Sequence, residues 1–192
     1  LSQPIESWDW KTPPAKDVLD LLARAGEDIA GNAPPSPTMV AASGQLDLPR
    51  GETVSVAQLS GSRMIRAIEL SAPKEHAIAL SNARLKITWD DREHASVDAP
   101  LALFFGTGTF YNRDDKEYLV KGFPMNVRFD AERIHLACYF PMPFFKSANI
   151  QLVRAESISI PNVSWRVMHE PFNDPPSHVG YFHATYRDHP SP

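Results

Sequence analysis

The chain has 192 residues, of which 43% are hydrophobic and 22% are charged, and these values exclude a chain that is disordered throughout. Its formal net charge of -4 gives no basic field for a phosphate backbone, which argues against nucleic acid as a partner. No apolar run approaches the roughly 18 to 20 residues that a membrane span requires, so no membrane partner is expected. The sequence does not indicate a cellular compartment, because neither its first residue, Leu1, nor its single cysteine distinguishes one compartment from another.

The first predicted element is a helix at residues 16–30, where apolar residues recur at helical spacing. Thr12 is the expected cap, because it precedes two prolines at the start of this pattern. The stretch APPSP at residues 33–37 is expected to be a stiff linker. We therefore predict an N-terminal extension at residues 1–37 and one domain at residues 38–192.

Beyond this linker the apolar pattern has a period of two in many short runs, which is typical of half-buried strands. The clearest run, at residues 84–89, places Leu85, Ile87 and Trp89 on one face. Strands are predicted at residues 53–56, 64–70, 84–89, 97–105, 118–120, 125–129, 133–140, 150–153, 158–160, 164–169 and 180–187. Together with the high proline count of 18, these short strands predict an all-β sandwich or barrel.

One stretch, CYFPMPFFKSANI at residues 138–150, joins a strand pattern to an aromatic turn. Pro141 and Pro143 are expected to stop an ordinary ladder strand, because proline has no N–H to donate. We predict a rigid aromatic wall that either fills a core or lines a binding cleft. Cys138 is the only cysteine, so it forms no internal disulfide and is expected to be a buried thiol in a strand.

Candidate catalytic groups have weak signals. In the acidic cluster Asp90, Asp91 and Glu93, one carboxyl could have a raised pKa and act as an acid, but a solvated hairpin turn is the favoured interpretation. Ser147 beside Lys146 lacks the third orienting group that a nucleophile requires, and Cys138 lacks it too. The four late histidines match no metal motif, so no metal or other cofactor is predicted; they are His169, His178, His183 and His189.

Four stretches, in this order along the chain, resemble glycoside hydrolase family 172, formerly domain of unknown function 2961. They are LPRGETVSVAQLSGSRMIRAIEL (48–70), LKITWDDREHASVDAPLALFFGTG (85–108), CYFPMPFFKSANIQLV (138–153) and GYFHATYR (180–187). The resemblance implies an all-β, jelly-roll-like β-sandwich, here with one N-terminal helix. It also implies cleavage of furanoside linkages of the fructose or arabinose type, two glutamates in a retaining mechanism, and trimers or hexamers.

Two departures from the family pattern affect the catalytic assignment. Leu103 occupies a position where family members often carry Asp, and the 192 residues contain neither of the later glutamate motifs, which resemble GEGDE and GTGTEDYF. A retaining enzyme needs two carboxyls about 5 to 5.5 Å apart, and no acid here has a motif that argues for such a pair. We assign no catalytic residue and expect the glutamates to lie outside this chain, in a larger polypeptide or assembly.

These observations predict the β-sandwich portion of a furanoside hydrolase, with a non-catalytic carbohydrate-binding or assembly sandwich as the alternative. Aromatic rings stack on sugar C–H surfaces, and Asp or Lys can bond hydroxyls, although each of these residues could equally serve core packing or a turn. The residues expected near the sugar are Asp90, Phe104, Phe105, Lys146 and His183. The expected partners are a carbohydrate and further copies of the chain.

Overall fold

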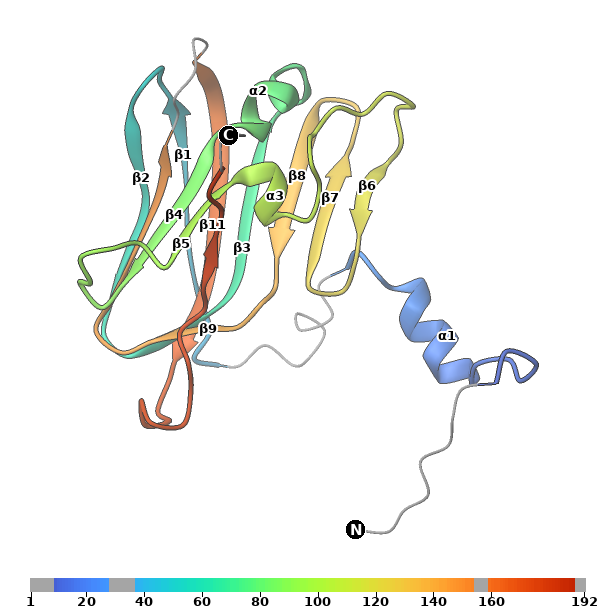
Figure 1. Cartoon of the computed structure of the whole chain (residues 1–192), viewed down its shortest axis with the longest axis horizontal. Coiled ribbons are helices and arrows are strands. Elements are labelled where there is room, and N and C mark those ends of the chain that lie inside the picture. Colours follow the sequence, from blue (N-terminus) through green and yellow to red (C-terminus); the bar gives the residue numbers. More distant parts are fainter. Residues whose placement is uncertain (1–8, 28–36, 154–158, 189–192) are drawn as a thin grey trace.

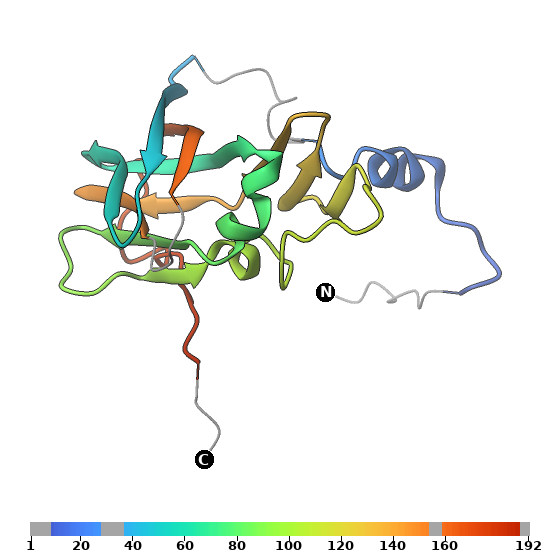
Figure 2. The same ribbon diagram turned by 90° about the horizontal axis from the view of Figure 1, so that it is seen from above.

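Two largely antiparallel sheets pack face to face in the computed structural model, which describes residues 9–27, 37–153 and 159–188 (Figures 1 and 2). The larger sheet contains β1 (Val40–Leu48), β3 (Arg63–Pro73), β6 (Tyr118–Lys121), β7 (Met125–Phe129), β8 (Arg133–Cys138), β9 (Met142–Phe144) and β11 (Ile160–Pro171). Its strand order is β1-β11-β3-β8-β7-β6, and β9 also pairs with β3.

The smaller sheet contains β2 (Thr53–Ser60), β4 (Arg84–Trp89), β5 (Val97–Pro100), β10 (Ser147–Val153) and β12 (Ala184–Thr185). Its order is β12-β5-β4-β10-β2, and only the β12–β5 pairing is parallel among the described strands. Four short helical segments are α1 (Lys16–Ala23), η1 (Lys74–His76), α2 (Ala77–Ser81) and α3 (Leu101–Phe104). The all-β sandwich with an N-terminal helix is therefore confirmed.

Alternation along the strands builds the core between the two sheets. Leu85, Ile87 and Trp89 of β4 are buried, while the residues between them are half-buried. Fully burying each such side chain contributes about 1.5 to 3 kcal/mol. The largest fully buried side chains include Trp89, Phe105, Phe110, Phe144, Leu48, Ile65, Ile68, Leu80, Leu101 and Ile134. The inner faces of both sheets thus supply one continuous core.

The aromatic stretch is mainly part of this core. β8 ends at Cys138, residues 139–141 leave the ladder as the prolines predict, and β9 then resumes on the same edge of β3. Pro143 nevertheless pairs with Met64, which differs from the expected turn. Proline is tolerated there because β9 pairs only with β3 among the described strands and is therefore an edge strand. Phe144 is fully buried and stacks on Trp89 with ring centroids 6.0 Å apart.

Several predicted strands have different limits in the structure. The prediction at 180–187 is wrong for most of its length, because only β12 at Ala184–Thr185 is a strand, and β8 ends at Cys138 where residue 140 was expected. The strand expected at 97–105 stops at Pro100, and α3 follows, because the run LALFF is buried as a helical turn in which the Phe105 amide donates to the Leu101 carbonyl at 2.9 Å. The strands expected at 158–160 and 164–169 are one strand, β11, in which Asn162 has a φ of 55° beside a register shift with β1. Ile158 lies outside the described residues.

The N-terminal helix is shorter than predicted. α1 ends at Ala23, and its N-cap is Ala15 without a side-chain bond, so Thr12 is not the cap. The end of the predicted helix at residues 28–30 and most of the linker at 33–37 lie outside the described residues. Within the described part of the chain, no helix has the length and apolar character needed to cross a membrane.

Candidate functional site

A tight turn follows β4 and presents two aspartates. Asp90 and Asp91 have φ values of 54° and 57°, and the Arg92 amide donates to the Trp89 carbonyl at 3.1 Å. Two consecutive left-handed residues closed by such a bond are typical of a type I′ turn, a conformation that Asn, Asp and Gly tolerate best. A turn at the acidic cluster is therefore confirmed, but Asp90 is half-buried and not solvated as expected.

The Asp90 carboxylate lies at the centre of a hydrogen-bond cluster. It accepts bonds from the amides of Phe145 at 3.0 Å, Lys146 at 2.6 Å and Ser147 at 3.0 Å. The Tyr181 hydroxyl donates a further bond at 2.6 Å. We call these five residues the Asp90 centre. It joins the turn after β4, the start of β10 and the C-terminal segment.

These bonds set the ionisation of the acid. Burial raises the pKa of the Asp90 carboxyl, but the hydrogen bonds from Tyr181 and from the three amides outweigh it and lower the pKa below its ordinary value. The same Asp90 contact raises the pKa of Tyr181. Asp90 is thus ionised at neutral pH, and it is not the carboxyl of the acidic cluster that could have a raised pKa and act as an acid.

Aromatic and cationic groups surround the centre. The rings of Phe145 and Tyr181 meet edge to face at 5.7 Å, and Phe172 lies 6.1 Å from Phe145. The Arg92 guanidinium carbon lies 3.9 Å from the Tyr181 ring centroid, within the range of a cation–π contact. Arg92 is exposed and Tyr181 half-buried, so this side of the centre faces solvent.

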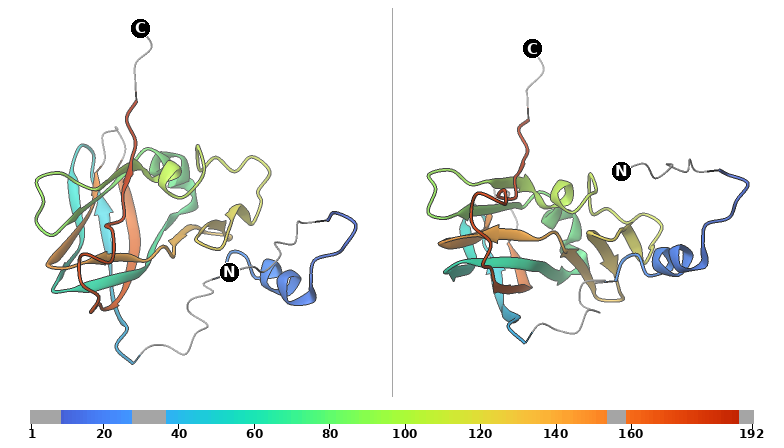
Figure 3. Two further views of the ribbon diagram at one scale, coloured as in Figure 1. Left: turned by 60° about the horizontal axis from the view of Figure 1, so that its bottom comes forward. Right: turned by 90° about the horizontal axis from the view of Figure 1, so that it is seen from below.

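The C-terminal segment binds to the edge of the smaller sheet beside β5 (Figure 3). The Trp89 indole N–H donates to the Phe182 carbonyl at 2.9 Å, and the Ala184 amide donates to the Ser96 carbonyl at 3.0 Å. The Phe182 ring packs against Phe104 at 6.3 Å and Phe140 at 5.7 Å. The GYFHATYR and CYFPMPF stretches, far apart in the sequence, are therefore adjacent in the fold.

Sequence reasoning placed five residues near a sugar, and the structure gives them different environments. Asp90 and Lys146 meet in the Asp90 centre, where the Lys146 side chain is exposed. His183 is exposed as well. Phe104 is 6% exposed and packs edge to face on Phe105, which is fully buried and offers no open face to a ligand.

The segment at residues 181–183 connects these positions, and sequence reasoning did not single out its first two members. Tyr181 bonds Asp90, Phe182 contacts Phe104, and His183 follows directly. The available signal was the GYFHA stretch itself, which was noted for its resemblance. Nothing in its spacing indicates that a tyrosine there reaches an aspartate 91 positions earlier.

The surroundings of the other candidate groups do not favour catalysis or metal binding. The Ser147 hydroxyl donates to Asp91 at 2.8 Å. Burial raises the pKa of the Cys138 thiol to about 11, with a backbone bond near Phe140 acting weakly against it, so this thiol is a poor nucleophile. Among the residues that the structure describes, no three His, Cys, Asp or Glu side chains gather as a metal site would require.

Comparison with known proteins gives one family. A family model described as GH172 domain-like matches residues 38–167, from just before β1 into β11. The match includes the turn after β4 and the start of β10, which form most of the Asp90 centre. No curated protein matches the chain.

Proposed function

The chain belongs to the GH172 domain-like family, and from this premise we propose that it is the β-sandwich portion of a glycoside hydrolase that cleaves furanoside linkages of the fructose or arabinose type. The observation that carries the proposal is the family match over most of the sandwich. The Asp90 centre supports it as a candidate sugar site, because this centre combines a fixed backbone with aromatic and polar groups that face solvent.

The catalytic glutamates of the proposed enzyme come from outside these 192 residues. A retaining mechanism requires a carboxylic acid with a raised pKa beside a second carboxylate. The pKa values of the Asp90 and Asp130 carboxyls are both lowered, which is the opposite of what a general acid requires. Asp90 therefore supports the loop at the start of β10 and supplies no proton.

The sugar would contact the exposed side chains around this centre. Lys146 and His183 supply donors for hydroxyl groups, and Tyr181 with Arg92 forms the adjacent wall. Phe104 and Phe105 would not contact the sugar but would support the segment that carries Tyr181 and His183. Phe104 packs against the Phe182 ring, and Phe105 packs against Phe104. In this proposal all five predicted residues have a role, and two of them would contact the sugar directly.

Hydrolysis assays test the catalytic half of the proposal. The purified 192-residue chain and the native protein, whose intact mass shows whether more chain follows Pro192, are incubated with 4-nitrophenyl arabinofuranosides and fructofuranosides. We expect the native protein to release nitrophenol and the 192-residue chain not to do so. Hydrolysis by the 192-residue chain alone would overturn the external location of the glutamates.

Variants of the exposed contacts test the position of the sugar. In the active native protein, Lys146→Ala and His183→Ala should each raise KM about tenfold, the effect of losing about 1.4 kcal/mol of binding. Lys116→Ala is the matched control, because this lysine is exposed in another loop beside Asp114. Equal KM values for the three variants would place the sugar elsewhere.

A non-catalytic carbohydrate-binding or assembly sandwich is the second candidate. It is favoured by one observation, that the Asp90 carboxylate is wholly occupied by protein donors. An intact mass that corresponds to these residues alone, together with binding of furanosides without cleavage, would support it. A longer native chain with two glutamate motifs would exclude it.

A further inference from the structure

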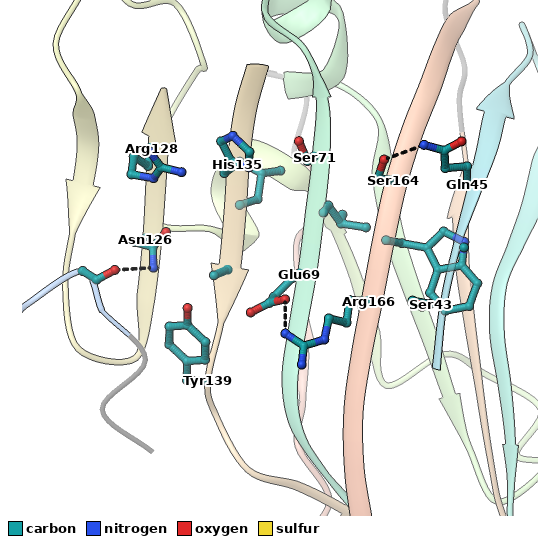
Figure 4. A pocket seen from close by; sticks show the side chains of 16 residues that line it. Ser43, Gln45, Glu69, Ser71, Asn126, Arg128, His135, Tyr139, Ser164 and Arg166 are labelled. Carbon is teal, nitrogen blue, oxygen red and sulfur yellow. Dashed lines mark hydrogen bonds and ion pairs between the residues drawn. The ribbon is translucent and has the colours of Figure 1, made fainter. Parts of the chain in front are cut away.

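The outer face of the larger sheet, which points away from the smaller sheet, has two rows of mostly polar side chains in register across five strands (Figure 4). One row contains Gln45, Ser164, Ser71, His135 and Arg128. The other contains Ser43, Arg166, Glu69, Ala137 and Asn126. The face forms a hollow of about 650 Å³, a volume in the ordinary range for ligand sites.

Neighbouring contacts hold most of these side chains in place. Arg166 pairs with Glu69 at 3.4 Å, and the Gln45 amide donates to the Ser164 hydroxyl at 3.4 Å. At one end of the hollow, Asn126 donates to the carbonyl of Gly26 at 3.0 Å, so the segment after α1 forms part of the rim. A polar face fixed in this way loses little side-chain entropy when it binds a ligand.

Two further contacts fix the middle of the face. The Arg133 guanidinium donates to the Ser71 hydroxyl at 2.7 Å and to backbone carbonyls of Ser71 and Asn162 at 2.9 Å. His135 contacts Asp130 at 2.6 Å. Ala137 lies between Glu69 and Asn126 in the second row, and its short side chain leaves space there.

Arg128 differs from the other charged residues of the hollow. Its side chain is half-buried, yet no hydrogen bond or ion pair joins its guanidinium to any other residue that the structure describes. Glu69 already faces Arg166, and Asp130 already faces His135. The hollow therefore contains one unmatched positive charge beside hydroxyl, amide and imidazole groups. Such a guanidinium is well suited to bind a carboxylate through two parallel hydrogen bonds.

We propose that this hollow is a second saccharide site that takes an acidic sugar, with the uronate carboxylate on Arg128 and its hydroxyls on Ser71, Ser164 and the Glu69–Arg166 pair. Hydroxyls both donate and accept, and these residues supply both kinds of group. The site belongs to the larger sheet, whereas the Asp90 centre follows β4 of the smaller sheet. It is thus separate from the proposed furanoside site and does not depend on it.

Calorimetric titration with trigalacturonate and with its methyl ester tests this site, because esterification removes the negative charges of the carboxylates and leaves the sugar hydroxyls unchanged. We expect the acid to bind at least tenfold more tightly than the ester, and we expect added salt to reduce this difference. Absence of binding by the acid, or equal binding of the acid and the ester, would overturn the proposal.

Variants of the 192-residue chain locate the binding. Arg128→Ala should fold normally, because this side chain has no hydrogen bond or ion pair to lose among the residues that the structure describes, and it should weaken trigalacturonate binding about tenfold. Arg128→Lys should retain part of the binding. Arg113→Ala removes the same charge from an exposed loop and should bind as the unmodified chain does. If Arg128→Ala binds unchanged, the site is wrong. These titrations measure binding and need no catalysis. Their result is therefore independent of whether the furanoside assay succeeds.

Discussion

At the scale of single residues, Asp90 and its neighbour Asp91 show how position changes the role of one residue type. Both have left-handed backbones in the same turn. Asp90 accepts bonds from three amides and the Tyr181 hydroxyl, whereas Asp91 accepts one bond from the Ser147 hydroxyl. The two residues therefore form a matched pair for mutation.

Glycine at each position separates the backbone effect from the effect of the carboxylate. Glycine adopts the left-handed conformation without strain, so both variants gain the same relief of backbone strain. Asp90→Gly leaves the amides of residues 145–147 without their acceptor, and we expect a loss of about 2 to 4 kcal/mol in the free energy of unfolding. Asp91→Gly should change it by less than about 1 kcal/mol. Urea unfolding measures both, and equal losses would contradict the central role of Asp90.

The lowered pKa of Asp90 also predicts how this stabilisation depends on pH. A carboxyl whose pKa is lower in the folded state binds fewer protons there, so its contribution is complete above the unfolded value of 3.8 and falls as the pH drops through that value. The stability difference between the unmodified chain and Asp90→Asn should therefore be constant near neutral pH and shrink below about pH 4. A difference that grows on acidification would show that the folded pKa is raised.

At the scale of elements, sequence pattern predicted the strands whose two faces differ. β4 and β7 have the predicted bounds, because apolar and polar residues alternate along β4 and turns flank both strands. β1 was missed, although its exposure alternates, because the inward positions of this edge strand begin with the small residues Ala42 and Gly44 and give little apolar signal. The run at 101–105 was assigned to a strand because its apolar residues are contiguous, and local pattern does not separate a buried strand from a buried helical turn.

The candidate site was predictable only in part, for a related reason. Asp90 and Lys146 were selected for their residue types, and the fold does bring them together. The contact between Tyr181 and Asp90 depends on pairing of β12 with β5 and on the path of the whole C-terminal segment, which no local pattern encodes. Long-range contacts of this kind require the assembled sheet.

The C-terminal segment should be the least stable part of the smaller sheet's edge. β12 has only two residues, so the bonds from Tyr181 and Trp89 provide much of its attachment. Tyr181→Phe keeps the ring against Phe145 but removes the donor to Asp90, and amide exchange at residues 181–186 should accelerate about tenfold while β3 and β8 stay protected. Tyr186→Phe is the control, because Tyr186 is 42% exposed. Uniform acceleration across the core would indicate global destabilisation instead.

At the scale of the whole molecule, the core of the sandwich is complete, but α1 has no buried residue. The helix has eight residues, and isolated helices shorter than about 12 residues are marginal in water. Its apolar side chains remain exposed, with Leu19 at 47% and Leu22 at 51%. The bonds of Gly26 to Gly122 and Asn126 attach only the segment that follows the helix.

We expect the apolar face of α1 to pack against another copy of the chain, the partner that the family resemblance implies. In the interface between two copies, a glutamate at this face would lose its water and gain no opposite charge. Leu22→Glu should therefore convert the assembly to monomers, which sedimentation velocity at micromolar concentration would detect. Lys16→Glu places the same residue at a polar position near Asp20 and should leave the assembly intact. A monomeric unmodified chain, or an assembly that survives Leu22→Glu, would contradict packing of α1 against another copy.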